Sequence, residues 1–273
     1  MEAWAAEQEC ETCAVVRGQR TDTLALAAAS RECGYVVFRG TRDLRNWMSD
    51  LDCRLRIADC GLGEVHDGFE CALASVEEEL DEVMERWSGG VKNVFFAGHS
   101  LGGALAMLAA ARMAVTRRVS GGSPETTGGS PVLPWVYTFG QPRVGNGAWA
   151  RWYDGVLRER SFRVVHADDV VPRVPWLLGV FRHAGHEVFF TGGNPPSLCF
   201  GATSRTDGTN GTDGTDGTCG MGGTGQAALV DASWVRKLPY DLLGLWRRHR
   251  IDLAALLADH RVSSYVRILN GEC

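Results

Sequence analysis

The sequence predicts an α/β fold with a largely parallel central sheet flanked by helices. Short apolar runs alternate along the chain with longer segments of helical periodicity, which is typical of parallel strands joined by right-handed crossovers. Hydrophobic residues make up 45% of the chain and charged residues 22%, as in ordinary globular proteins. Because 273 residues suit one large α/β unit, we expect a single domain over residues 1–273.

The expected strands are short and mostly continuous apolar runs, a pattern that favours strands covered on both faces. They span residues 13–17, 24–29, 35–38, 94–97, 135–139, 162–165 and 186–191. The first two and the last would extend the edges of the sheet, and the remaining four would form its centre.

The expected helices lie between and after these strands. Their periodic apolar patterns span residues 68–88, 101–116 and 146–158. A leucine-rich stretch over residues 228–258 is also predicted to be largely helical, with a break at Pro239.

Two segments without apolar periodicity interrupt this pattern. Residues 119–134 are rich in Gly, Ser and Pro and predict a surface loop. Residues 201–225 contain four tandem Asp/Asn-Gly-Thr triplets. This composition predicts a flexible insertion, because it offers no apolar surface whose burial could offset the cost of ordering.

Charge and hydropathy argue against a nucleic-acid partner and against a transmembrane segment. The chain has 28 Lys and Arg against 33 Asp and Glu, and it has no long basic run, which argues against nucleic acid. No stretch reaches the roughly 18 apolar residues of a membrane-spanning helix, so no transmembrane segment is expected. The acidic N-terminus lacks the features of a secretory signal, which predicts a cytoplasmic protein if that terminus is complete.

The nine cysteines predict mostly free thiols rather than a disulfide framework or a metal centre. They form an odd set that is spread over a long chain, unlike the dense frameworks of small secreted proteins. Cys10 and Cys13 form a CxxC, but no second Cys pair or His pair stands at zinc-binding spacing. We therefore expect no metal and no cofactor.

The strongest chemical signal is the sequence Gly98-His99-Ser100-Leu101-Gly102, a G-x-S-x-G motif. It follows the apolar run 94–97 and opens the helical segment 101–116, which is the strand-to-helix context that a nucleophilic serine requires. The sharp turn leaves no room for a Cβ atom on either side, and the helix N-terminus offers backbone N–H groups to an oxyanion. The simpler alternative is a plain turn in which Ser100 caps a helix.

Around this motif the sequence resembles the fungal-type class 3 lipases, a branch of the α/β-hydrolases. Residues 98–106 look like their nucleophile elbow. Further blocks match in the same order: 36–41 (VVFRGT), 45–51 (RNWMSDL), 65–69 (VHDGF), 137–146 (YTFGQPRVGN) and 169–175 (DVVPRVP). The resemblance covers about residues 35–190 and a short C-terminal piece.

A nucleophilic serine needs a base, and the base needs a carboxylate. Asp168 and Asp169 both follow the strand 162–165, and the resemblance selects Asp169, which leaves Asp168 as a turn residue. Residues 259–265 resemble the family's C-terminal histidine block, which selects His260 as the base. The alternatives are His183, His186 and His249, the first two in a segment that the resemblance marks as non-catalytic.

The resemblance also implies an oxyanion hole and a lid. The two oxyanion donors would be the backbone N–H of Leu101 and a group of Thr41, whose alternative role is that of a plain turn residue. Leu44, Trp47 and Met48 have the spacing of one face of a short helix. By resemblance this helix is a lid that turns outward on a lipid surface, whereas the alternative is a turn that packs on the core.

Together these features predict a serine esterase or lipase that hydrolyses acyl esters of acylglycerol-type lipids through Ser100, His260 and Asp169. Transient contact with a lipid surface would accompany the reaction. Within the same chemistry, a phospholipase A1 or a galactolipase is the alternative. A lipase-like interaction module without catalysis is the alternative of a different class.

Overall fold

The structure is a computed structural model of the chain. It describes residues 10–19, 21–41, 54–58, 63–87, 91–119, 133–166, 169–175, 180–190, 198–200 and 260–269. The predicted insertion at 201–225, the predicted helix at 228–258 and most of the predicted loop at 119–134 lie outside these residues.

The centre of the fold is an eight-stranded sheet in the order β1-β2-β3-β6-β7-β9-β11-β12. The strands are β1 Thr12–Arg17, β2 Leu24–Ala29, β3 Cys33–Phe38, β6 Asn93–His99, β7 Trp135–Phe139, β9 Ser161–His166, β11 His186–Phe190 and β12 Leu198–Phe200. The five strands from β3 to β11 pair in parallel, and β1, β2 and β12 add antiparallel edges. The predicted mostly parallel sheet is confirmed, and β12 is a strand that the sequence did not indicate.

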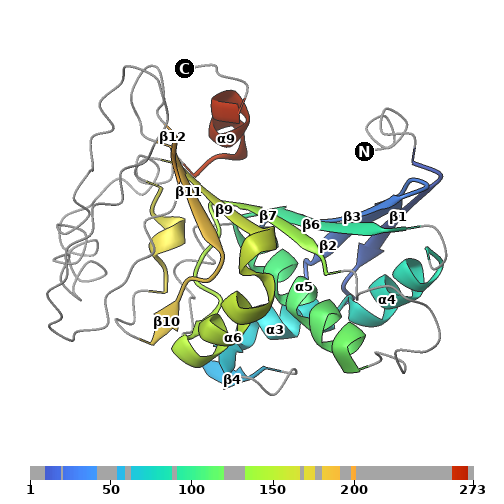
Figure 1. Ribbon diagram of the computed structural model, residues 1–273, viewed down its shortest axis with the longest axis horizontal. Helices are drawn as coiled ribbons and strands as arrows, with labels where there is room; N and C mark the ends of the chain where they lie inside the picture. The colour runs from blue at the N-terminus through green and yellow to red at the C-terminus, as the bar shows by residue number, and fades with distance from the viewer. Residues whose placement is uncertain are drawn as a thin grey trace, which may run out of the picture.

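Four helices pack on one face of this sheet, and a fifth lies above the other face near one end (Figure 1). They are α3 Asp67–Ala74, α4 Glu77–Glu85, α5 Leu101–Val119, α6 Gly147–Leu157 and α9 Val262–Leu269. Two single 3-10 turns, η1 Arg158–Arg160 and η2 Val171–Arg173, complete the helical elements of the described chain. The main core lies between the sheet and α3 to α6, and a small cluster of Val164, Val188 and Tyr265 lies under α9.

The predicted helix at 68–88 is in fact two helices, α3 and α4, because the chain breaks at Ser75 and Val76. The hydroxyl of Ser75 donates to the carbonyl oxygen of Ala72 at 2.7 Å, and its oxygen lies 2.6 Å from Thr21 Oγ1. A serine side chain that bonds to a nearby carbonyl competes with the helical backbone. Val76 leaves the helical conformation (φ −125°, ψ −3°), and its side chain is buried in the core. Core packing of Val76 therefore also stabilises the break.

A second, smaller sheet of four short antiparallel strands was not predicted from the sequence. Its order is β10-β8-β5-β4, with β4 Leu55–Ile57, β5 Glu64–His66, β8 Gly145–Asn146 and β10 Phe181–Arg182. Strands of two or three residues are too short to show an alternating pattern. The sheet joins the start of α3 to the start of α6, where Asn146 caps the helix by accepting a hydrogen bond from Trp149 N at 3.0 Å.

The two faces of the central sheet differ in exposure. Along β3, β6 and β7, side chains toward the helices are buried, whereas most of those on the other face are only partly buried. Aromatic rings occupy many of these partly covered positions and stack on each other across strands, as Tyr35 does on Phe95 at 5.5 Å and Tyr137 on Phe162 at 5.4 Å. The continuous apolar runs therefore reflect helix cover on one face and neighbouring rings on the other.

The described residues can be checked for membrane-spanning helices, free cysteines and metal-binding clusters. No helix in the part of the chain that the structure describes is long and apolar enough to cross a membrane. Cys10, Cys13, Cys33 and Cys71 are free thiols. Among the same described residues, no group of three or more His, Cys, Asp or Glu side chains could hold a metal ion.

Candidate active site

Ser100 lies at the sharp turn between β6 and α5 that the motif predicts. Its φ of +58° is in the left-handed region, where non-glycine residues are uncommon and usually mark a functional turn. The backbone N–H of Ser100 donates to the carbonyl oxygen of Phe139 at 2.9 Å, which ties the turn to the end of β7. The side chain is buried, and its hydroxyl has no hydrogen-bond partner among the described residues.

The glycines on either side of Ser100 are required by close backbone contacts, as predicted. A Cβ on Gly98 would lie 2.2 Å from the carbonyl carbon and oxygen of Gly102. A Cβ on Gly102 would lie 2.2 Å from the carbonyl oxygen of Phe38, at the end of β3. These distances are far below van der Waals contact, so any larger side chain would force the turn open.

His260 and Asp169 form a buried pair at the same edge of the sheet. The Nδ1 atom of His260 lies 2.9 Å from Oδ1 and 2.8 Å from Oδ2 of Asp169, and both side chains are almost completely buried. A carboxylate can only accept at this position, so Nδ1 carries a proton and Nε2 of the neutral ring keeps a free lone pair. Nε2 has no hydrogen-bond partner among the described residues.

The Asp169 carboxylate is held by two further donors. The hydroxyl of Tyr265 donates to Oδ2, and the backbone N–H of Val171 donates to Oδ1 at 2.9 Å. Tyr265 reaches Asp169 although it follows His260 by five residues, because α9 begins at Val262 and turns its buried side back toward the sheet. Gly140 makes room for this cluster, since a Cβ there would lie 2.7 Å from Oδ2 of Asp169.

His99 connects the serine turn to the histidine. Its Nε2 atom lies 2.7 Å from the carbonyl oxygen of His260, and the two imidazole rings are 4.5 Å apart between centroids. Burial, and then the positive charge that His260 can carry, lower the pKa of His99 to about 4. The neutral ring therefore donates from Nε2 to this carbonyl oxygen. Because His99 directly precedes Ser100, the bond holds the backbone of His260 close to the serine turn.

The expected oxyanion donors lie at this edge as well. Leu101 is the first residue of α5, so its backbone N–H has no acceptor within the helix. Thr41 is half-buried and follows Gly40, where a Cβ would lie 2.8 Å from the carbonyl oxygen of His99 and 3.4 Å from Cβ of Ser100. The expected lid residues Leu44, Trp47 and Met48 lie outside the described residues.

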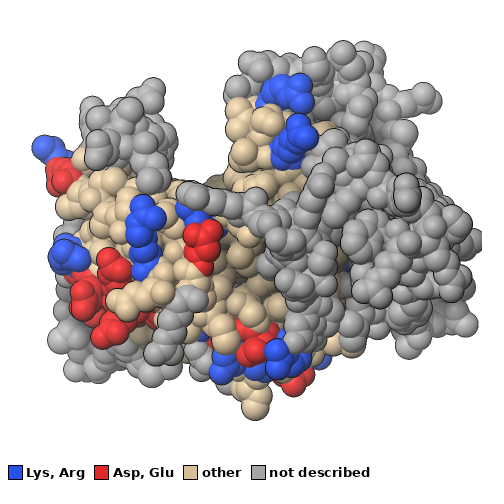
Figure 2. All heavy atoms as spheres, turned by 180° about the vertical axis from the view of Figure 1, so that it is seen from behind, with Lys and Arg blue, Asp and Glu red and all other residues tan. Residues whose placement is uncertain are grey.

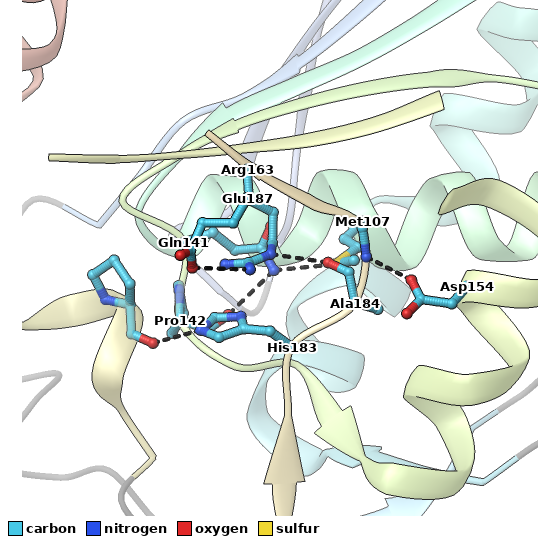
Figure 3. A network of polar contacts seen from close by, with 10 residues as sticks. Met107, Gln141, Pro142, Asp154, Arg163, His183, Ala184 and Glu187 are labelled. Atoms are coloured by element: carbon cyan, nitrogen blue, oxygen red, sulfur yellow. Dashed lines mark hydrogen bonds and ion pairs between the residues drawn. The ribbon is translucent and has the colours of Figure 1, made fainter. Parts of the chain in front are cut away.

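The alternative histidines have other surroundings. His183 is part of a polar network that also contains Arg163, Glu187 and Gln141 (Figure 3). Its Nε2–H donates to the carbonyl oxygen of Pro172 at 2.6 Å. Burial and the charges of Arg163 and Arg143 lower the pKa of His183 well below its ordinary value.

His186 lies on the surface of the central sheet, in β11, and is not part of the polar network around His183. It stacks on Phe162 at 5.9 Å and lies 3.4 Å from the carboxylate of Glu159. Asp168 and His249 lie outside the described residues.

Sequence reasoning missed three residues that shape the site, namely His99, Gly140 and Tyr265. His99 is the variable position between Gly98 and Ser100 in the motif, so the motif assigns it no role. Its contact with His260 joins residues that are 161 positions apart in the sequence. Gly140 directly follows the expected strand 135–139. A glycine at the end of a strand can indicate that other side chains pack closely against the backbone, and this was the signal available in the sequence. Tyr265 was visible in the C-terminal block, but only the helical path of α9 brings it back to Asp169.

The family model described as lipase (class 3) matches residues 35–178. A lipase from Rhizomucor miehei is 33% identical over 184 residues, which cover 65% of this chain and 47% of the relative. A secreted mono- and diacylglycerol lipase from Fusarium solani is 33% identical over 168 residues, 58% of this chain and 44% of the relative. The chain thus spans about half the length of these curated relatives.

The solved structures agree with the sequence matches. A triacylglycerol lipase whose catalytic centre is described as a serine protease triad superposes with a TM-score of 0.59, with 30% identity over 71% of each chain. The fold is therefore the predicted α/β-hydrolase fold. Since the family model covers more than half of the sequence, the chain belongs to the class 3 lipase family.

Proposed function

We propose that this chain is a serine carboxylic ester hydrolase that acts on acylglycerol-type lipids. The observation that carries the proposal is the arrangement at the carboxyl edge of the sheet. A buried histidine is held by a carboxylate, and both its Nε2 and the hydroxyl of the strained Ser100 lack partners among the described residues. A hydroxyl and an imidazole nitrogen that have no other protein partner among the described residues are available to a substrate as nucleophile and base.

In the proposed mechanism, Ser100 Oγ attacks the ester carbonyl while Nε2 of His260 accepts its proton. Asp169 stabilises the imidazolium that forms, and the hydrogen bonds from Tyr265 and Val171 hold the carboxylate in place. The backbone N–H of Leu101 and a group of Thr41 stabilise the oxyanion. His260 then returns the proton to the departing alcohol, and water releases the acyl group by the same steps in reverse order.

The relatives support the substrate class. They are named for triacylglycerols and for mono- and diacylglycerols, so acyl esters of glycerol are the first substrates to test. We further propose transient contact with a lipid surface, because such substrates gather in interfaces, and we retain Leu44, Trp47 and Met48 as the lid that would meet it.

The direct test is hydrolysis of p-nitrophenyl esters of increasing chain length, followed by emulsified mono-, di- and triacylglycerols. Ser100→Ala should lower kcat/KM on the order of 10⁴-fold or more, because serine and histidine act as one unit. Near-normal turnover by a folded Ser100→Ala protein would refute the assignment. Inactivity of the wild-type chain on all esters, together with no labelling by a reactive phosphonate, would instead indicate a non-catalytic module.

A further inference from the structure

A cavity of about 350 Å³ lies at the end of α5 that is remote from Ser100. Its wall on α5 is formed by residues from Ala109 to Thr116. Since a helix rises 1.5 Å per residue, Ala109 lies roughly 12 Å along α5 from Leu101, and the other wall residues lie farther still. None of the residues of the proposed catalytic cluster lines this cavity. It is therefore separate from the esterase site.

The interior of the cavity is apolar. Its apolar lining comes from α3, α4, α5, the chain after α4 and the start of β6, and includes Leu80, Met84, Trp87, Val94 and Met113. Ligand sites in proteins usually have volumes of about 300 to 1,000 Å³ and a mostly apolar lining with a few polar groups. The volume and lining are thus suited to one short alkyl chain.

The polar groups of the lining are mainly acidic. Glu77, Asp81 and Glu85 stand one helical turn apart along α4 and all border the cavity. Arg112 also borders it, but this guanidinium lies 2.9 Å from Glu70 and forms a second ion pair with Glu77. Acidic side chains gather on this flank of the molecule (Figure 2).

The negative charge at the rim is not fully compensated. Burial, and then the neighbouring charges of Glu77 and Glu85, raise the pKa of Asp81. A cation placed beside these carboxylates would relieve their mutual repulsion, whereas an anion would increase it. Trp87 contributes an indole ring to the same lining, and tryptophan is the side chain that attracts ammonium groups best.

We propose that this cavity binds a single-chain amphiphile with a cationic, ammonium-type head. The alkyl chain would fill the apolar interior, and the head would lie between the carboxylates of α4 and the indole of Trp87. The proposal does not depend on the esterase activity, because no residue of the lining belongs to the proposed catalytic cluster.

The test measures binding of dodecyltrimethylammonium, below its micellar concentration, to the full chain by isothermal titration calorimetry. The wild-type protein is first treated with an uncharged, reactive alkyl phosphonate ester that bonds to Ser100, and excess reagent is removed, so that the esterase site is occupied. We expect saturable one-site binding, with an affinity at least about tenfold above that of dodecyl sulfate, because the chains are identical and the heads carry opposite charges. Equal affinity for the two detergents, or no saturable binding, would overturn the proposal.

Matched variants locate the site. Replacing Asp81 by Asn and Glu85 by Gln together should weaken dodecyltrimethylammonium binding roughly three- to tenfold, as expected for partly exposed charges. The control carries Glu78→Gln and Glu82→Gln, which remove the same charge from the same helix but do not border the cavity. An equal loss in both pairs would show a non-specific charge effect and would contradict the proposal.

Two further variants fill the space itself. Ala109→Phe should abolish binding by occupying the interior, and Thr116→Trp should do so from the exposed end of the wall. Thr116→Trp decides the outcome if the larger buried residue at position 109 prevents folding. Undiminished binding in a folded variant of either kind would place the ligand elsewhere and overturn the proposal.

Discussion

Two histidines of this protein, His260 and His183, show how surroundings decide what an imidazole can do. His260 lies against the carboxylate of Asp169, whereas His183 donates to a backbone carbonyl and faces the positive charges of Arg163 and Arg143. Both rings are held by a short hydrogen bond, so geometry alone does not separate them. The two rings are distinguished by the sign of the neighbouring charge.

The difference bears directly on catalysis. A general base must carry a positive charge in the transition state, and a neighbouring carboxylate stabilises that charge. The arginines around His183 oppose it: burial first, and then the charges of Arg163 and Arg143, lower the pKa of His183. The network in Figure 3 thus places His183 beside the positive charge of Arg163, whereas His260 at the proposed active site lies beside a negative charge.

The largest expected effect separates the two histidines directly. His260→Ala should lower kcat/KM on a soluble ester about as much as Ser100→Ala, on the order of 10⁴-fold or more. His183→Ala should leave the rate within roughly threefold and cost about 1 to 3 kcal/mol of unfolding free energy, because it leaves a buried carbonyl without its donor. Steady-state kinetics and urea unfolding of both variants test this, and an inactive His183→Ala with an active His260→Ala would reverse the assignment.

The second prediction compares the two carboxylates. Asp169→Asn should lower kcat by about 10³-fold, because an amide can donate to His260 Nδ1 and so favour the wrong tautomer. Glu187→Gln, which changes the partner of Arg163 in the other network, should leave kcat unchanged and lower the melting temperature only. Equal kinetic effects of the two substitutions would mean that Asp169 acts only as a structural residue.

A third prediction concerns the pH dependence of stability. In the unfolded chain His99 would take up a proton near its ordinary pKa of 6.5, but in the fold its pKa is about 4. Between these values the unfolded state binds more protons, so this contribution to stability is complete above pH 6.5 and is lost as the pH falls toward 4. The loss amounts to at most about 3 kcal/mol.

His99→Asn should flatten this part of the stability profile, as measured by urea unfolding at several pH values. His183→Asn should also flatten it, since the pKa of His183 is lowered in the fold as well. The two variants differ in activity, because only His99 touches the backbone of His260. An unchanged slope in His99→Asn would show that His99 is protonated in the fold.

The smallest expected effect is that of Tyr265→Phe. The substitution removes one of three donors to the Asp169 carboxylate and leaves those from His260 and Val171. We expect a loss of about 1 kcal/mol in stability and a roughly three- to tenfold lower kcat with an unchanged KM. A change in KM alone would indicate that Tyr265 contacts substrate rather than positioning Asp169.

Much of the fold could be predicted because its signals are local. The central strands are marked by apolar runs such as 94–97 and 135–139, and the elbow is marked by glycines whose neighbours exclude a Cβ. The proposal of Ser100 as nucleophile rests on this local context alone. Asp169 and His260 needed the resemblance as well, because the residues themselves left Asp168 and three further histidines open.

The remaining features depend on contacts between distant segments. The break at Ser75 is stabilised by Thr21 of the β1–β2 connection, and the carboxylate of Asp169 is held by Tyr265, which lies 96 residues further along the chain. The charge around His183 likewise comes from Arg143 and Arg163 on other elements. The sequence pattern within one segment cannot indicate which residues of distant segments will contact it.

The stacked rings on the less covered face of the sheet also give the protein an optical signature. Tyr35 and Phe95 pair across β3 and β6, and Tyr137 and Phe162 pair across β7 and β9, each pair with ring planes within 17° of parallel. Slipping any of these strands by one residue would turn its ring to the opposite face and separate the pair. Near-ultraviolet circular dichroism, which senses the fixed packing of aromatic side chains, would therefore report the alignment of the strands during refolding.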